Sequence, residues 1–285
     1  MFVFLSKLSA YSVNDTLQLK HIADSLLLNK KYYEASIFYQ KLDFFSQSET
    51  MKNEAKFSAA NCYKQYNNYT AGINQLNSIG IEGAADSVIF RVKYQSALMS
   101  YLNNDLTQAE SFLEQLNYLI KDSSYIIKSL MLHVFVLNEQ YKWTKAKEKL
   151  GKLNNGLNLN NSEAFNFNKR VIDSIYSTKN IPKLKNVEKA GRISTFFPGF
   201  GQCYAGNYAE GISSFFAIAV IAGAMVAGVI YQYYFTSIFV GNLLIGKFYL
   251  GGIKRAEFLA EKYNYLHSKN YNQSLKEQVK QHFIN

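Results

Sequence analysis

Side chains that commonly carry catalysis are few and scattered in this chain. Histidine occurs four times and cysteine twice, at His21, His133, His267, His282, Cys62 and Cys203. Their separations match neither a zinc-ligand pattern nor a Cys-x-x-Cys redox pair, and no Ser/His/Asp or Cys/His set pairs a nucleophile with its base. We therefore predict two unpaired thiols and a protein that is not an enzyme, without catalytic, cofactor-binding or metal-binding residues.

A glycine-rich stretch is the other candidate for chemistry. Its turn motif consists of Pro198, Gly199, Gly201, Gln202, Tyr204 and Gly206. A phosphate-binding loop would need G-x-x-x-x-G-K-[ST] after a β-strand, and neither feature is present. We therefore expect no nucleotide cofactor. Instead the stretch predicts a tight turn at a membrane surface, with Phe196, Phe197, Phe200 and Tyr204 at the level of the lipid headgroups.

The elements around this turn are dominated by one uncharged stretch. Gly211 to Gly246 are 36 residues without Asp, Glu, Lys, Arg or His. A single helical crossing needs roughly 20 apolar residues, so the stretch predicts a membrane hairpin with helices at about 212–230 and 235–250. The whole membrane domain, turn included, is expected over 193–251.

Small residues recur every four positions in the first predicted span, at Ala219, Gly223 and Ala227. Such a face lets membrane helices pack closely. Its partner is either the second span or the same helix of another copy, which would make a homo-oligomer.

The second predicted span contains two polar residues, Asn242 and Lys247. Lys247 lies near the end of the span, so its long side chain can reach the membrane surface. Asn242 suits a hydrogen bond between helices. In the alternative, Asn242 and Gln232 line a transport path.

Basic residues flank the apolar stretch and account for most of the net charge of +10. Residues 168–192 hold seven basic and two acidic side chains, and residues 252–285 hold six and three. No nucleic-acid-binding module accompanies them, so we expect no nucleic-acid partner. Beside a membrane segment they are expected to meet anionic lipid or to set topology. Residues 252–285 predict an amphipathic helix that lies on the membrane, packs on the linker or is simply solvated.

The first part of the chain repeats every 37 residues. Small residues stand at Ala35, Gly72, Ala109 and Ala146; large ones precede them by three at Tyr32, Tyr69, Leu106 and Trp143 and follow them by four at Tyr39, Leu76, Leu113 and Leu150. This spacing predicts four helical hairpins over 15–155 that bury their apolar faces by stacking. We expect a capping helix over 161–178 and a basic linker over 179–192. The predicted fold is therefore all-α.

The columns of the repeat resemble the tetratricopeptide repeat, although the period is 37 rather than 34 and no Pro closes each unit. The resemblance implies a helical solenoid whose groove binds a peptide or a protein segment. On this basis Tyr32, Tyr69 and Trp143 are candidates for the partner-binding groove. The alternative is that these aromatic side chains are only core.

The end of the chain carries a second resemblance. The P-G-x-G-Q motif, two apolar segments and then Tyr249-x-Gly251-Gly252-Ile253-x-x-Ala256 are similar to a family of bacterial membrane proteins. Phe248-Tyr249-Leu250-Gly251 also resembles the signature of broader two-transmembrane-domain families. The bacterial membrane family joins tetratricopeptide-like repeats to a two-helix hairpin and has no assigned biochemical function. The resemblance therefore implies an architecture and not an activity.

Two features give opposite expectations for topology. Residues 1–12 resemble the end of a secretory signal peptide, with Ala10 and Ser12 at the cleavage position; the alternative is an ordinary frayed N-terminus. A signal would place the repeats outside the cytoplasm, whereas the basic flanks favour the cytoplasmic side. Long exported domains cross largely regardless of charge, so we expect extracytoplasmic repeats on a multi-pass protein of a bacterial inner membrane.

These observations favour a membrane-anchored scaffold or adaptor. Its repeats would bind a protein or peptide partner, and its hairpin would hold that partner at the lipid bilayer. The alternative is a subunit of a small oligomeric transporter or channel, which the absence of charged residues from the apolar stretch disfavours.

Overall fold

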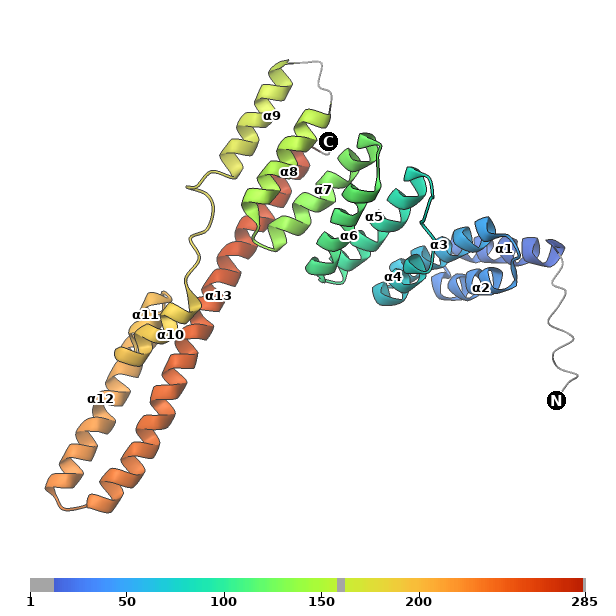
Figure 1. Cartoon of the computed structure of the whole chain (residues 1–285). Coiled ribbons are helices and arrows are strands. Elements are labelled where there is room, and N and C mark those ends of the chain that lie inside the picture. Colours follow the sequence, from blue (N-terminus) through green and yellow to red (C-terminus); the bar gives the residue numbers. More distant parts are fainter. Residues whose placement is uncertain (1–12, 158–161, 284–285) are drawn as a thin grey trace, which may run out of the picture. The chain divides into compact units, whose positions relative to one another are not determined.

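The structure, a computed structural model, describes residues 13–157 and 162–283 (Figure 1). Those two ranges are helical with no β-strand, which confirms the predicted all-α class. The chain divides into two compact units, one ending at Ser174 and the other beginning at Ile175. The signal-like residues 1–12 lie outside the described residues.

Eight helices of the first unit pair into the four predicted hairpins. They are α1 (Val13–Leu28) with α2 (Tyr32–Phe45), α3 (Glu49–Gln65) with α4 (Tyr69–Asn77), α5 (Asp86–Leu102) with α6 (Leu106–Leu119), and α7 (Ser123–Glu139) with α8 (Trp143–Gly156). Each helix packs against the next one in the chain. The large residues that begin the second helices, such as Tyr32 and Trp143, are those that the repeat placed 37 apart.

The turns inside the four hairpins share one backbone conformation. A residue with positive φ occurs in each, at Lys30, Asn67, Asn104 and Tyr141, again 37 apart. The amide that follows it donates across the end of the helix, as in Lys31 N–H to Leu26 O at 2.9 Å. This is a Schellman cap, which satisfies carbonyls that the helix leaves unpaired. The turns of the four hairpins are therefore repeated helix caps.

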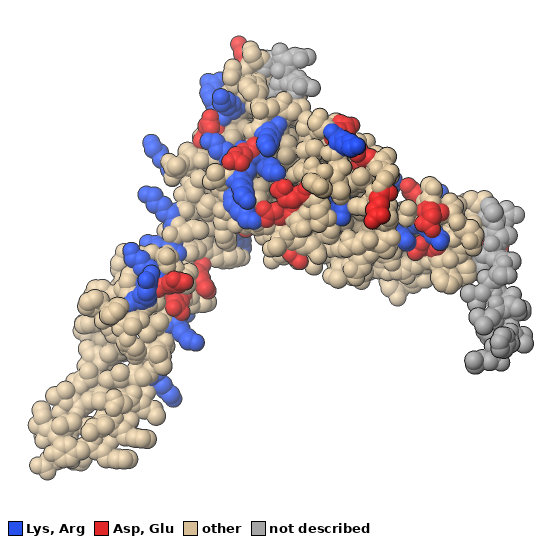
Figure 2. Space-filling view, in the orientation of Figure 1, with Lys and Arg blue, Asp and Glu red and all other residues tan. Residues whose placement is uncertain are grey.

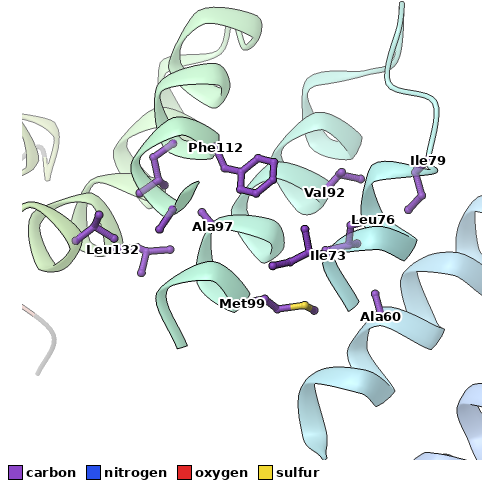
Figure 3. Close-up of a cluster of buried hydrophobic side chains, with 12 residues drawn as sticks. Ala60, Ile73, Leu76, Ile79, Val92, Ala97, Met99, Phe112 and Leu132 are labelled. Carbon is purple, nitrogen blue, oxygen red and sulfur yellow. The ribbon is translucent and has the colours of Figure 1, made fainter. Parts of the chain in front are cut away.

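The predicted small and large columns form the core of the first unit. Ala35, Ala109 and Ala146 are fully buried, and so are Leu76 and Leu113. One cluster runs without a break from Ala60 in the second hairpin to Val136 in the fourth; Figure 3 shows most of its side chains. Each hairpin thus buries its apolar face against its neighbours, as stacked repeats require.

The predicted capping helix is α9 (Ser162–Ile175), and its side chains bond to α8. The Asn154 amide donates to Phe165 O at 3.3 Å and accepts from the Asn168 amide at 3.1 Å. Lys147 and Asp173 form an ion pair at 2.7 Å. These contacts cover the last hairpin of the first unit.

The second unit contains α10 (Val187–Phe196), α11 (Phe200–Tyr204), α12 (Tyr208–Ile230), a π-helical turn η1 (Thr236–Val240) and α13 (Gly241–Phe283). The predicted linker over 179–192 needs correction, because α10 begins inside it. The Asn186 side chain accepts from Lys189 N–H at 2.8 Å and caps this helix. Ala190 of α10 then packs in one buried cluster with Ala256 and Ala260 of α13.

The predicted second span and the predicted C-terminal helix are one continuous helix. No break occurs at Gly251-Gly252, and the helix runs on to Phe283. Glycine costs about 1 kcal/mol in a helix, and packing of the turns that follow offsets this cost. Here Ala256, Leu259 and Ala260 are buried against α10 and Ala205. Three environments were predicted for residues 252–285. The first turns of this segment pack on the preceding part of the chain.

Candidate functional site

The P-G-x-G-Q motif forms the base of the α12–α13 hairpin. Gly199 has φ 93°, a left-handed conformation that favours glycine. A Cβ on Gly199 would meet Gly211 O, and one on Gly201 would meet Ala190 O. The two glycines are therefore places where α11 touches the backbones of α12 and α10 without room for a side chain.

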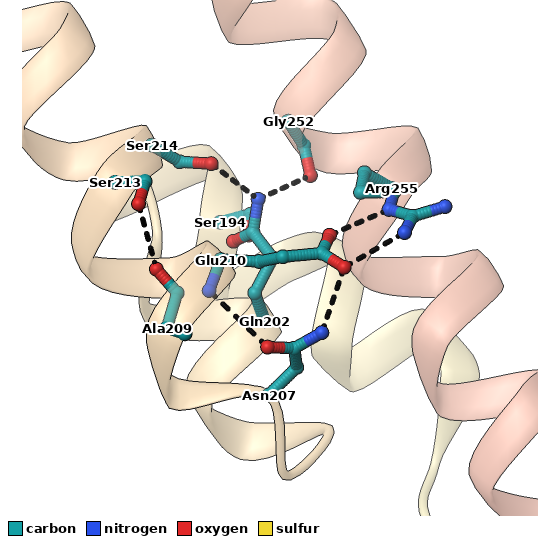
Figure 4. Close-up of polar contacts among 9 residues, drawn as sticks. All are labelled: Ser194, Gln202, Asn207, Ala209, Glu210, Ser213, Ser214, Gly252 and Arg255. Carbon is teal, nitrogen blue, oxygen red and sulfur yellow. Dashed lines mark hydrogen bonds and ion pairs between the residues drawn. The ribbon is translucent and has the colours of Figure 1, made fainter.

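Gln202, on α11, is hydrogen-bonded to α10, α12 and α13 and so joins the four helices of the base, as Figure 4 shows. Its side chain is fully buried. Its amide oxygen accepts from the Ser194 hydroxyl at 3.2 Å, and its amide nitrogen donates to Ser214 Oγ at 3.3 Å and to Gly252 O at 3.1 Å. The sequence places Gln202 in a turn motif but carries no local signal for this bridging role.

An ion pair closes the base on the exposed side. The Arg255 guanidinium donates twice to the Glu210 carboxylate, at 2.7 and 2.8 Å. Asn207 donates to the same carboxylate at 2.7 Å. The first turn of α12 is thereby fastened to α13.

Three of the four aromatic residues predicted at the headgroups are exposed, and the fourth is not. Phe196, Phe197 and Phe200 are 78%, 63% and 54% exposed. Tyr204 instead packs against the buried cluster of the base, and its hydroxyl accepts from Asn186 N–H at 3.1 Å. The prediction for Tyr204 is corrected accordingly, because its position in α11 turns the ring toward α10 and α13.

The helices above the base have the length and composition of membrane spans. Two helices qualify among the described residues, Tyr208–Ile230 and Thr236–Phe283. Only 0% and 11% of the most apolar segment of each helix is buried, whereas the apolar core helix of a soluble protein is mostly buried. In Figure 2, Lys and Arg gather toward the α10–α11 end of this unit, and the α12–α13 turn shows no charged side chain on the visible face.

The face of Ala219, Gly223 and Ala227 is not the contact surface of this hairpin. All three residues are exposed, and a Cβ on Gly223 would meet nothing within 4 Å. The helices instead meet where a Cβ on Gly228 would touch Ser237 Oγ and one on Gly241 would touch Met225. Of the two partners predicted for the small face, the second span is excluded.

Both polar residues of the second span point away from α12. Asn242 and Lys247 are exposed, and the Asn242 amide has no hydrogen-bond partner among the described residues. Lys247 precedes Arg255 by eight residues, which is about 12 Å along a helix. Contrary to the prediction, Lys247 is not near the end of its helix, because α13 continues beyond it.

The residues predicted for the partner-binding groove begin the second helix of three hairpins. Trp143 is 7% exposed, and Tyr32 and Tyr69 pack against the buried clusters of their repeats. These contacts fit the alternative, in which the aromatic side chains are core.

A hollow does occur in the first unit, between α3 and α5. It has a volume of about 280 Å³ and is lined by Asn53, Glu54, Phe57, Val88, Arg91 and Val92, among others. The α4 helix has 9 residues, where α2, α6 and α8 have 14 each. The chain from 78 to 85 lines part of the hollow in place of further helical turns.

Charge and aromatic surface meet in this hollow. Arg91 forms an ion pair with Glu54 at 3.1 Å, and its guanidinium lies 4.2 Å from the centroid of the Phe57 ring. Glu54 and Arg91 are 37 residues apart, so they occupy the same position in consecutive repeats. The repeat pattern gives no signal for this pair, because its columns contain like residues and Glu54 and Arg91 are of opposite charge.

No family model matches the chain, and neither a curated protein nor a solved structure is similar enough to count as a match.

Proposed function

We propose that this protein is a membrane-anchored interaction protein. Its repeats bind a protein or peptide, and its α12–α13 hairpin holds that partner at a bilayer. The observation that carries the anchor is the exposure of the two most apolar segments, which are 0% and 11% buried. Apolar surface of this extent needs a cover, and lipid is the cover that suits helices of this length.

The dimensions of the hairpin support a full crossing. From Glu210 to Ile230 a helix rises about 30 Å, which is the thickness of a bilayer's hydrocarbon core. The far turn presents Tyr231, Tyr233 and Tyr234, all exposed, and tyrosine is enriched at membrane–water interfaces. The near end presents the three exposed phenylalanines and the Glu210–Arg255 pair.

A two-helix hairpin returns the chain to the side that it left, so the repeats and α13 end on one side. We place that side outside the cytoplasm of a bacterial inner membrane, because residues 1–12 resemble a signal peptide. The basic flanks argue for the opposite side, and a long exported domain overrides them.

Membrane attachment is expected to depend on the hairpin. The full chain should remain with membranes through high salt and carbonate and be released only by detergent, whereas deletion of 208–250 should release most of it. Protease added to spheroplasts should digest the repeats. Full release of the intact chain by carbonate would refute the anchor. Protected repeats would refute the proposed side and leave the anchor standing.

The hollow between α3 and α5 is the proposed partner site. It offers apolar wall from Phe57, Val88 and Val92 and a charge of each sign from Glu54 and Arg91. Peptide-binding surfaces combine these features, with aromatic and Arg side chains supplying most of the energy. A peptide with one apolar anchor and a charged neighbour fits this lining.

A photo-crosslinking residue at position 88 should therefore form a covalent crosslink with the partner in intact cells. The matched control is the same residue at Tyr118, which is 89% exposed on α6 and outside the hollow. Arg91→Ala should weaken the crosslink at position 88 several-fold. Equal crosslinking from both positions, or none from position 88, would remove the hollow as the partner site.

A further inference from the structure

We infer that two copies of this chain associate inside the membrane through paired Asn242 side chains on α13. The inference rests on the proposed membrane hairpin and adds its oligomeric partner. The carrying observation is the Asn242 amide, which is exposed on the outer surface of the hairpin. It forms no hydrogen bond with any described residue, although α12 packs against the same helix.

The depth of Asn242 follows from the contacts beside it. A Cβ on Gly241 would touch the side chain of Met225, so Asn242 lies level with that part of α12. Met225 precedes the last residue of α12, Ile230, by five residues and follows Glu210 by fifteen. At 1.5 Å per residue, Asn242 lies about 8 Å inside one edge of the proposed span and about 22 Å from the other. The amide is thus within the hydrocarbon.

An amide in hydrocarbon has strong need of a partner. Acyl chains offer neither donors nor acceptors, and a polar group left unpaired there costs several kcal/mol. Two serines of the hairpin differ from Asn242 in this respect. Ser237 donates to Tyr233 O at 2.8 Å, and Ser213 donates to Ala209 O at 2.9 Å. Both hydroxyls are satisfied by their own helix, which the Asn242 amide is not.

A second copy is the occupant that this chemistry selects. The asparagine amide carries both a donor and an acceptor, so two of them satisfy each other reciprocally. Copies inserted in the same orientation hold their Asn242 residues at the same depth, and a two-fold axis along the membrane normal brings them together. A single buried Asn pair fixes register and copy number in coiled coils by the same means.

The surface around Asn242 permits this approach. Gly246 lies one helical turn away on the same face, and a Cβ there would meet nothing within 4 Å. The helices can therefore come close beside the paired amides, as glycine allows in membrane helices.

The test measures association of the full chain in phosphatidylcholine vesicles. Energy transfer between chains with donor or acceptor dyes on an N-terminal tag is followed as the protein-to-lipid ratio falls. Asn242→Leu should raise the dissociation constant about tenfold, the effect of one to two interhelical hydrogen bonds. Asn242→Gln keeps the amide and should stay within about threefold of the original chain.

Leu243→Ala is the matched control, because Leu243 is the next residue and is 52% exposed. It should leave the dissociation constant within about twofold, since it removes no hydrogen bond. An original chain that inserts but stays monomeric, or equal weakening by the Leu and Gln variants, would overturn the pairing and leave the anchor intact. A chain that does not enter the vesicles at all would overturn the anchor and the pairing together.

Discussion

Gly201→Ala is expected to destabilise the base of the hairpin by about 3 kcal/mol, the upper part of the range for overpacking a core. A Cβ at this position would meet Ala190 O, Ser194 Oγ and the Ala256 side chain at once. The first of these is backbone, so no rotamer change relieves the contact, and α11 must move away from α10. That movement also displaces Gln202, whose hydrogen bonds join the four helices.

Tryptic cleavage in α10 measures this effect. Lys189 and Arg192 are exposed, but cleavage there requires local unfolding, so its rate follows the population of the open form. Gly201→Ala should raise the rate roughly 100-fold, as 3 kcal/mol implies. The control is Gly251→Ala, where a Cβ meets nothing within 4 Å, and its rate should stay equal or fall. Similar rates in both variants would show that the contact at Gly201 is not tight.

The repeat unit could be predicted from sequence because its signal is local and redundant. Ala35, Gly72, Ala109 and Ala146 each mark the same contact between helices, and four copies of one spacing exclude coincidence. The turns carried a weaker signal, since the position with positive φ is Asn in two repeats but Lys30 and Tyr141 in the others. The hollow between α3 and α5 carried none, because it arises from the early end of α4.

The hairpin shows the opposite case. Its existence follows from composition, but its packing face does not. In water, burial of apolar side chains identifies the face that meets a partner; in lipid every face is equally apolar. A row of small residues therefore does not indicate whether it faces the other helix of the hairpin or the lipid. Ala219, Gly223 and Ala227 face outward, while Gly228 and Gly241 make the contact with the facing helix. The Gln202 bridge was missed because it joins residues 194, 214 and 252, which no local pattern relates.

The first unit is expected to lose stability as the pH falls from 7 to 5. His133 is fully buried on α7, and neither ring nitrogen has a hydrogen-bond partner. Glu114 Oε1 lies 3.3 Å from Nε2 without the geometry of a hydrogen bond. Burial, helped by the nearby Lys149 ammonium, lowers the pKa of His133 from 6.5 to about 4.

The sign of the effect follows from proton binding. Between pH 6.5 and 4 the unfolded chain binds a proton at residue 133 and the folded chain does not, so acid favours unfolding. A shift from 6.5 to about 4 corresponds to about 3 kcal/mol in all, of which about 2 kcal/mol is lost between pH 7 and 5. The carboxyl of Glu110, whose pKa is lowered from 4.5, acts below this window. The loss above pH 5 is thus specific to histidine.

Trp143 makes the measurement direct, because it is the only tryptophan of the chain and begins α8, which packs against α7. Urea unfolding of the full chain in detergent, followed by its fluorescence, gives the free energy of unfolding at each pH. His133→Leu should abolish the dependence between pH 7 and 5, because leucine fills the same apolar site without binding a proton. His21→Leu, at an exposed position of α1, should retain it. An unchanged slope in His133→Leu would show that the pH dependence does not arise from residue 133.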